Sequence, residues 1–190
     1  MTEITFKLTN ESPLLMHNAQ LSDPLNYYSK QIKRVSSKRK KVDADQDELG
    51  RLEFLGSLYT TEVDGKPVPC LPGEVLEATI VGAGRTRKLG KQVQSGVYVL
   101  KDAPLKYDGP TDPDELWLDE RFRLRRSVKV QRARIMRTRP KFDKWTADVT
   151  ISLYETDIDK KTVEELMAIA GELVGVGDWR PRYGRFSVSK

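Results

Sequence analysis

The amino-acid sequence predicts an α+β fold with the order strand, helix, strand, strand, helix, strand. Three patterns predict it. Alternating apolar and polar residues mark strands, apolar residues at helical spacing mark helices, and irregular polar stretches between them indicate insertions. With the insertions set aside, the six elements cover residues 3–9, 73–88, 126–137, 144–155, 160–174 and 183–189.

Three of the strands rest on alternation of period two. Ile4, Phe6 and Leu8 alternate with polar residues, which predicts a half-buried first strand. Residues 144–155 give the clearest strand of the chain, and residues 183–189 close it as a short strand.

The basic stretch 126–137 is predicted to be a strand with a bulge. The direction of the alternation changes between Val130 and Ala133, which places the bulge near Gln131-Arg132. We expect this strand to pair with the one that follows it in an antiparallel hairpin.

Two helices complete the order. The helix at 73–88 follows a proline turn, and the helix at 160–174 opens with Thr162 and Glu165, which resemble a capping box. The segments between include a helix at 43–59, a hairpin at 60–70 turning at Asp64-Gly65, and a short strand at 97–100. The arrangement is ferredoxin-like (RRM-like), a βαββαβ palm with two helices on one face of a four-stranded antiparallel sheet.

We expect a single domain over residues 1–190 with two insertions. Residues 18–43 form an inserted basic arm, because the periodicity dissolves there and lysines and arginines accumulate. Residues 101–120, rich in Pro, Asp and Gly, form an inserted, thumb-like loop that Trp117 and Leu118 anchor.

Composition narrows the class of protein. The only cysteine, Cys70, excludes an internal disulfide and a cysteine-based zinc site. The first ten residues already form an amphipathic strand and not a leader, and no apolar run is long enough to span a membrane. We therefore expect a cytoplasmic protein with no membrane partner, and we predict no metal and no cofactor.

The net charge of +5 is unevenly distributed. Residues 30–41 carry seven lysines and arginines, residues 121–141 carry ten, and neither stretch contains an acid. The first indicates either a solvated arm or a basic finger that orders on a polyanion, with Tyr27 and Tyr28 beside it. The second indicates a charge-protected edge strand or a strand that follows a phosphate backbone, and ten cations exceed what protection needs.

The closing stretch, Gly175–Lys190, combines three glycines and three arginines with a Trp and a Tyr. Glycine permits close backbone approach, guanidinium groups suit phosphate, and aromatic rings offer stacking faces. The alternative is a glycine-rich turn before the last strand, with solvated arginines. The position of this stretch between the second helix and the last β-strand favours a role at the edge of a surface that binds a nucleic-acid strand.

Pro13–His17, Leu71–Ala78 and the glycine-rich run Gly175–Phe186 resemble motifs of one family. These short stretches are similar to the RAMP superfamily of CRISPR-associated proteins, most closely its backbone-subunit (Cas7-like) branch. The resemblance implies a ferredoxin-like palm, an inserted thumb or finger, and side-by-side assembly along single-stranded RNA. The chain is short for such a subunit, so a freestanding phage or mobile-element relative fits the resemblance equally well.

No catalytic residue is assigned. His17, the only histidine, is a weak candidate because no second histidine or orienting partner accompanies it. Asp23 lies in the loop after the first strand, where the family's RNA-cutting members place an aspartate. A turn-forming Asp before Pro24 explains it as well.

The sequence therefore predicts sequence-independent binding of single-stranded RNA or DNA, by a homo-oligomer or filament, with other CRISPR-type subunits as further partners. The alternatives are a RAMP-type endoribonuclease using His17 or Asp23, and a protein-assembly module that binds no nucleic acid. The predicted nucleic-acid contacts are Lys33, Arg34, Lys38, Arg39, Lys40, Arg85, Arg87, Arg125, Arg126, Arg132, Arg134, Arg137, Trp179, Arg180, Arg182, Tyr183 and Arg185.

Overall fold

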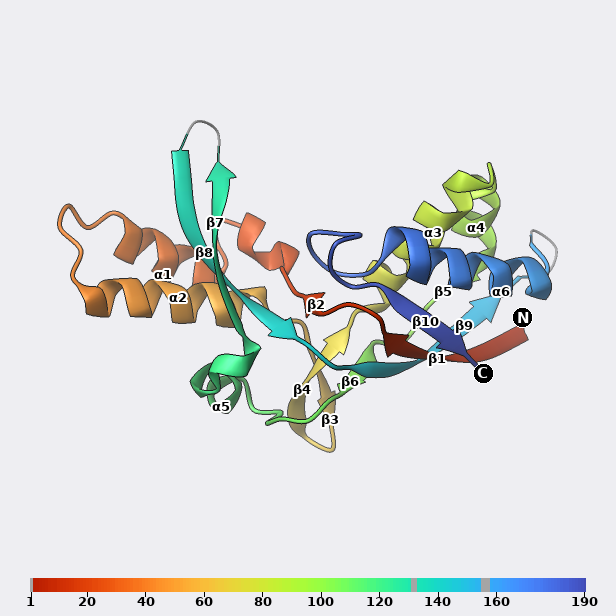
Figure 1. The fold of residues 1–190 in the computed structure, drawn as a ribbon, viewed down its shortest axis with the longest axis horizontal. Coiled ribbons are helices and arrows are strands. Elements are labelled where there is room, and N and C mark those ends of the chain that lie inside the picture. Colours follow the sequence, from red (N-terminus) through yellow and green to blue (C-terminus); the bar gives the residue numbers. More distant parts are fainter. Residues whose placement is uncertain (1, 131–132, 155–157) are drawn as a thin grey trace.

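The structure is a computed structural model that describes residues 2–130, 133–154 and 158–190. It is an α+β protein in which all described strand pairs are antiparallel, which confirms the predicted class. Figure 1 shows two parts side by side. A large sheet with helices on one face forms the palm, and an upright hairpin with further helices lies beside it.

The large sheet has the strand order β10-β1-β9-β6-β4-β3, and β5 also pairs with β9. Its centre is the pair of β1 and β9, in register from Thr2 opposite Leu153 to Thr9 opposite Thr146. The sheet strands are β1 (Thr2–Asn10), β3 (Thr60–Val63), β4 (Lys66–Leu71), β5 (Val97–Tyr98), β6 (Ala103–Lys106), β9 (Thr146–Leu153) and β10 (Phe186–Ser189).

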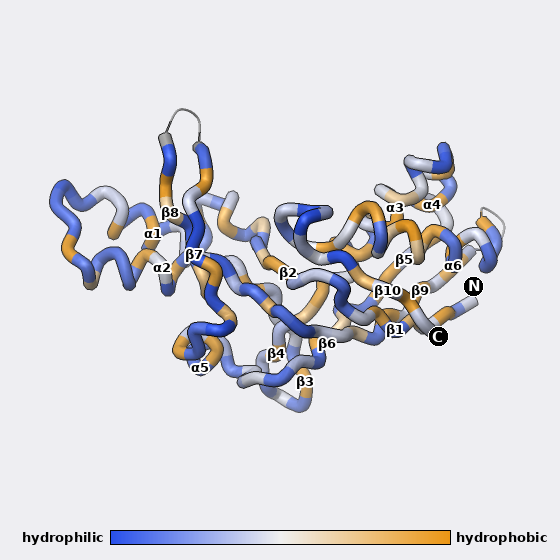
Figure 2. The backbone as a smooth tube through the Cα atoms, viewed as in Figure 1, coloured by the Kyte–Doolittle hydropathy of each residue, from blue (hydrophilic) through white to orange (hydrophobic). Residues whose placement is uncertain are grey.

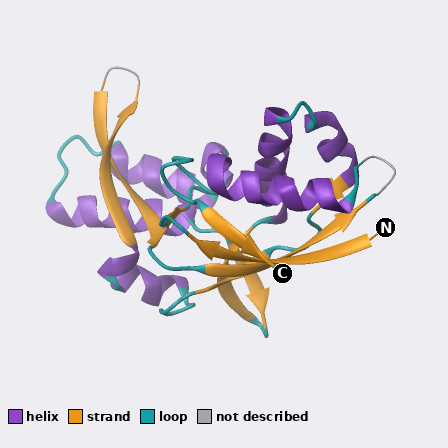
Figure 3. Ribbon diagram, turned by 45° about the vertical axis from the view of Figure 1, so that its right-hand side comes forward, coloured by secondary structure: helices purple, strands orange, loops and turns teal. Residues whose placement is uncertain are grey.

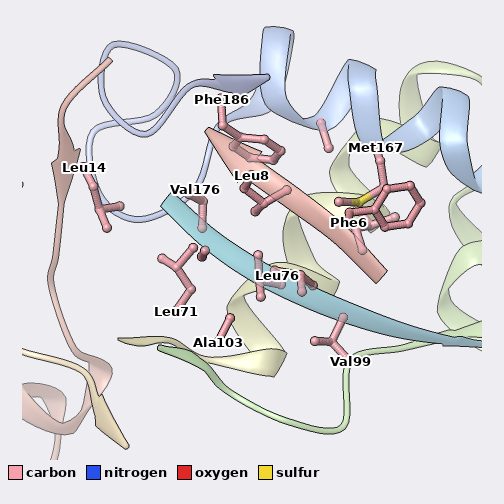
Figure 4. Packing of buried hydrophobic residues seen from close by; sticks show 14 of the residues in the cluster. Phe6, Leu8, Leu14, Leu71, Leu76, Val99, Ala103, Met167, Val176 and Phe186 are labelled. Atoms are coloured by element: carbon pink, nitrogen blue, oxygen red, sulfur yellow. The ribbon is translucent and has the colours of Figure 1, made fainter. Parts of the chain in front are cut away.

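Alternation along β1 and β9 decides which face of this sheet is buried. Ile4, Phe6 and Leu8 are buried, as are their neighbours Val149 and Ile151 on β9. Figure 4 shows Phe6 beside Met167, with Leu76 among the same buried side chains. The helices of the palm are α3 (Gly73–Thr86), α4 (Gly90–Gly96), α6 (Lys160–Ile169) and the π-helical turn η3 (Ala170–Val174).

A small sheet, β2-β8-β7, forms the second part of the molecule. Its long hairpin stands beside α2, and strand β8 of the hairpin contacts α2 (Figure 3). The remaining elements are β2 (Leu14–Leu15), η1 (Ala19–Ser22), α1 (Tyr27–Ser36), α2 (Asp43–Ser57), α5 (Pro113–Leu118), η2 (Glu120–Phe122), β7 (Arg123–Val130) and β8 (Ala133–Phe142).

The predicted strand 126–137 is wrong, because this stretch spans two strands. β7 ends at Val130 and β8 begins at Ala133, and the two pair with each other. β8 also pairs with β2, and β9 pairs with β1, β5 and β6, so the expected hairpin with 144–155 does not form. The bulge predicted at 131–132 lies outside the described residues.

The predicted loop at 101–120 is wrong in part. Ala103 and Leu105 are buried in β6, which pairs with β9 and β4 inside the large sheet, and Pro113 opens helix α5. Trp117 does anchor the segment, because its ring packs edge-on against Phe54 at 5.4 Å between centroids. Leu118 does not, because 75% of its surface is exposed.

The predicted irregular arm at 18–43 is also ordered differently. It contains η1 and the helix α1, which begins after Asn26, whose side chain accepts a hydrogen bond from the Tyr28 amide. Helix α1 ends at Ser36, and Ser37 is its C-cap residue. Figure 2 shows α1 and the connection to α2 as largely hydrophilic.

Two further local predictions need comment. The hairpin turn at Asp64-Gly65 is confirmed, with positive φ at both residues, as a two-residue turn of this type requires. The capping box at Thr162 is wrong, because Asp159 caps α6 and accepts hydrogen bonds from both the amide and the hydroxyl of Thr162. In the described part of the chain, no helix is long and apolar enough to cross a membrane.

Candidate nucleic-acid interface

The hairpin of β7 and β8 carries most of the chain's concentrated positive charge. Residues directly opposite each other in an antiparallel pair share a face. The register therefore places Arg126 beside Arg137 on one face and Lys129 beside Arg134 on the other. Arg125, Arg126, Lys129 and Arg134 are exposed, and none of them joins an ion pair within the described residues.

The base of the hairpin is fixed by contacts to α2 and α5. The buried carboxylate of Glu53 accepts a hydrogen bond from the Thr138 amide at 2.9 Å and forms an ion pair with Arg137. The guanidinium of Arg123 lies over the Trp117 ring, 4.6 Å from its centroid. The lower hairpin is therefore held rigidly, while the upper part projects beyond α1 and α2 in both ribbon views (Figures 1 and 3).

The cations of the 30–41 run divide into paired and unpaired groups. Arg34 forms an ion pair with Glu48 at 3.1 Å and Lys38 with Asp45 at 2.5 Å. Lys33, Arg39 and Lys40 are exposed and join no ion pair within the described residues. Of the adjacent aromatic rings, Tyr27 is 65% exposed, whereas Tyr28 is partly buried and lies against Gly56 of α2.

The closing loop, residues 175–185, is held against the chain that follows β1. The Asp178 amide donates to the Leu15 carbonyl at 2.8 Å, and the Gly184 amide donates to the Pro13 carbonyl at 2.8 Å. The Thr79 hydroxyl of α3 lies 3.3 Å from the Gly175 carbonyl. Two of the stretches singled out in the sequence, Pro13–His17 and Gly175–Phe186, thus meet in space, and Thr79, which follows the third, also contacts the loop.

The outer side of this loop presents aromatic and cationic groups together. The rings of Trp179 and Tyr183 lie 6.0 Å apart between centroids at an interplanar angle of 35°, and Trp179 is 39% exposed. Arg182 and Arg185 are exposed, and Arg180 donates to the Thr79 hydroxyl at 3.3 Å while staying largely in solvent. An ion pair between Asp178 and Arg139 joins the loop to β8.

Between the hairpin, α1 and η1 lies a pocket of about 500 Å³. His17 lines it with Lys33, Arg137 and Arg139, and its Nδ1 atom lies 3.4 Å from the Ser57 hydroxyl. Burial, with the positive charges of Arg139 and Arg137, lowers the pKa of His17 below its ordinary value. The imidazole is consequently neutral at pH 7, and the pocket has a positive potential.

The other residues considered for catalysis have structural roles. The Asp23 carboxylate is exposed and accepts a hydrogen bond from the Leu25 amide at 2.8 Å, which makes it a turn residue. Burial raises the pKa of the Cys70 thiol to about 12, so it is protonated at neutral pH. Within the described residues, no group of three His, Cys, Asp or Glu side chains is placed to hold a metal ion.

Not every predicted contact residue belongs to this surface. Arg85 and Arg87 are exposed at the end of α3, on the far side of the palm from the hairpin in both ribbon views. Arg132 lies outside the described residues. The prediction omitted Lys129 and Arg139, although the same basic alternation that singled out Arg125 and Arg137 includes them.

The exposed positions of the central palm strands carry little that suits base stacking. Opposite pairs on the open face include Thr5 with Thr150 and Lys7 with Asp148, whereas Ser152, opposite Glu3, is buried. The hydroxyls of Thr5 and Thr150 hydrogen bond to each other at 3.0 Å. The features suited to a polyanion therefore lie on the hairpin, α1 and the closing loop.

A scan against protein-family models finds none that matches this chain, and a search of curated proteins finds no match either.

Proposed function

We propose that this protein binds single-stranded RNA or DNA along its hairpin and closing loop, through phosphate contacts and base stacking rather than sequence reading. The observation that carries the proposal is the presence of two pairs of directly opposed cations on the hairpin, Arg126 with Arg137 and Lys129 with Arg134. Like charges directly opposite one another destabilise a strand pair, by up to about 1 kcal/mol.

Protection of an edge strand needs charges along it but does not need them to face each other. A bound phosphate backbone would turn both repulsive pairs into favourable contacts, since each phosphate can accept hydrogen bonds from two cations. Glu53 offsets only Arg137, at the hairpin base. The upper hairpin is thus the segment that a polyanion would stabilise most.

The palm supports the same proposal. The palm follows the order of a ferredoxin-like fold if β5 and β6, taken together as one broken strand, replace the strand first expected at 126–137. The other members of that order are the strands β10, β1 and β9 and the helices α3 and α6. The thumb would then be the hairpin and α1, α2 and α5. The resemblance to the RAMP backbone subunits adds side-by-side assembly along the strand to the proposal.

The test is binding of a fluorescent single-stranded oligonucleotide at several salt concentrations. The hairpin variant replaces Arg125, Arg126, Lys129 and Arg134 with Gln, and the control replaces four exposed palm lysines, Lys7, Lys66, Lys160 and Lys161, with Gln. Each phosphate contact to a single strand contributes about 0.7 to the slope of log affinity against log salt. We expect the hairpin variant to lower the slope by roughly 2 to 3 and the control by less than about 1.

Two outcomes would reject the proposal. One is the absence of binding by the wild-type protein at low salt. The other is equal loss of slope in both variants, which would indicate only a dependence on net charge. Purification of the chain in a stable complex with an acidic protein and without nucleic acid would support the protein-assembly alternative instead.

One observation favours RNA cleavage as a second candidate function. His17 is neutral at pH 7, as a general base must be, and it shares its pocket with two arginines suited to a phosphate. Cleavage would leave RNA shortened after incubation with wild-type protein and intact with His17→Ala. Asp23→Ala should cleave as wild type does, because the Asp23 carboxylate already holds its own turn.

A further inference from the structure

The pocket beside His17 is a separate feature from the open hairpin surface. It is enclosed by the face of β8 that carries Arg137 and Arg139, by Lys33 of α1, and by the end of α2 at Ser57. Its volume of about 500 Å³ lies in the range of sites for small molecules and nucleotides.

Charge in the pocket is only partly compensated. Glu53 pairs with Arg137, and Asp178 pairs with Arg139, which leaves Lys33 without an acid within the described residues. Burial and the charge of Arg137 lower the pKa of Arg139, while the charge of Glu53 opposes that shift. An anion with several acceptor oxygens would relieve the repulsion between Arg137 and Arg139.

The rest of the lining suits more than a bare anion. Leu21, Ile32 and Val128 supply apolar surface, and Ser22, Ser29 and Ser36 supply hydroxyl groups. The pocket therefore combines cations with apolar groups and neutral hydrogen-bonding groups. This combination suits a phosphate that is attached to a sugar and a base.

We propose that this pocket binds one nucleoside phosphate, with the phosphate on Lys33, Arg137 and Arg139 and the base against Leu21, Ile32 and Val128. The nucleotide could come from two sources. It could be an end or an internal unit of the bound nucleic-acid strand, and this case rests on the proposed function. It could also be a free nucleotide, and this case is independent of the proposed function. Both share one chemistry, and the experiment separates them.

His17 provides a direct reporter, because the chain has one histidine and no other imidazole overlaps the NMR resonances of its ring protons. The charged groups that face it are Lys33 from α1, Glu53 from α2, and Arg137 and Arg139 from β8, with Asp178 behind Arg139. A bound phosphate adds negative charge beside the imidazole, so the pKa of His17 should rise when the pocket fills.

The experiment titrates the protein with adenosine and uridine monophosphates, with inorganic phosphate, and with short oligonucleotides bearing either a 5′-phosphate or a 5′-hydroxyl. We expect the mononucleotides to shift the His17 resonance and raise its pKa, and inorganic phosphate to bind at least about tenfold more weakly. Tighter binding of the 5′-phosphorylated oligonucleotide would assign the pocket to a strand end. Equal binding of the two oligonucleotides, with the His17 shift retained, would assign it to an internal nucleotide.

Two substitutions on one helix provide the matched pair. Lys33→Glu reverses a charge that lines the pocket, and Lys30→Glu reverses an exposed charge one turn earlier that does not line it. We expect Lys33→Glu to weaken mononucleotide binding by about tenfold or more and Lys30→Glu by no more than about twofold.

A His17 resonance that ignores every nucleotide, or equal losses from the two substitutions, would overturn the inference. These outcomes are independent of the oligonucleotide salt test. If the protein binds oligonucleotides but the His17 resonance does not change, the pocket proposal is rejected and the proposed function stands. If mononucleotides shift the His17 resonance but oligonucleotides do not bind, the pocket proposal stands and the proposed function is rejected.

Discussion

At the scale of single residues, glycine holds the closing loop in place. Gly184 has a φ of 75°, and a Cβ atom there would lie 1.7 Å from the carbonyl oxygen of Val176. Its amide donates to Pro13, and its carbonyl accepts from the Val176 amide. No other residue type can satisfy this conformation and this contact together.

We therefore predict that Gly184→Ala destabilises the protein by about 3 kcal/mol or more, since backbone strain and a steric clash add. Gly65→Ala is the control, because Gly65 has nearly the same φ of 74° but no atom within 4 Å of a Cβ. It should cost only about 1 to 2 kcal/mol, the strain alone. Urea unfolding measures both, and equal losses would show that Gly184 does not lie against the backbone of Val176.

The residue scale also shows what a sequence cannot reveal about charge. Arg34, Lys38 and Arg137 were predicted as phosphate contacts, yet each has an acid as its neighbour in the fold. Glu53 is 84 residues away from Arg137 in the chain. No local pattern relates two such positions, so sequence alone could find the cationic stretches but not which of their members are already paired.

At the scale of elements, Glu53 connects α2 to the hairpin. One carboxylate oxygen binds the Thr138 amide, and the other pairs with Arg137, whose side chain is 39% exposed. A buried amide left without an acceptor costs roughly 1 to 3 kcal/mol. The partial exposure of Arg137 reduces what the ion pair itself contributes.

We predict that Glu53→Leu destabilises the protein by about 2 kcal/mol, while Glu53→Gln, which keeps an acceptor for the Thr138 amide, costs about half as much. Thermal or urea unfolding gives the two values. Hydrogen exchange at the Thr138 amide should quicken in the Leu variant and stay slow in the Gln variant. If both variants lose the same amount of stability, the charge of Glu53 rather than its hydrogen bond to the Thr138 amide holds the hairpin.

Elements with regular periodicity were predictable, and elements defined by distant contacts were not. The strands β1 and β9 and the helices α2, α3 and α6 follow their apolar spacing. The hairpin was missed because its connecting sequence, Gln131-Arg132, lacks the Gly, Asn or Asp that marks a tight turn. The direction of the alternation changes between Val130, where β7 ends, and Ala133, where β8 begins.

The second edge of the palm was missed for a related reason. β6 contains Pro104, and proline inside a strand argues against a place within a sheet. Burial of Ala103 and Leu105 between β9 and β4 overrides that local preference. Helix α1 was hidden by its basic run, although Asn26 supplied an N-cap that the sequence contained.

At the scale of the whole molecule, the segment that projects from the body is also rich in positive charge. The hairpin projects from the body, and its cations extend to the projecting end (Figure 1). A second copy bound next along a strand would lie within reach of this hairpin. The palm's edge strands, β10 and β3, are at opposite ends of the large sheet, so neighbouring copies can approach without disturbing its centre.

We therefore predict that copies of the chain bind side by side on a strand. Native mass spectrometry with oligonucleotides of increasing length should show complexes that gain one 21.7 kDa subunit for every added site, with a site size of roughly 4 to 16 nucleotides. Long strands should fill cooperatively, because each bound copy offers its neighbour both phosphates and protein contact. At moderate salt, the four-residue hairpin variant should no longer form this series of complexes of increasing subunit number (a ladder), and the palm lysine control should still form it. A single copy on strands of every length would contradict assembly while leaving the phosphate-binding surface intact. A ladder that forms without nucleic acid would show that the subunits associate through protein contacts alone.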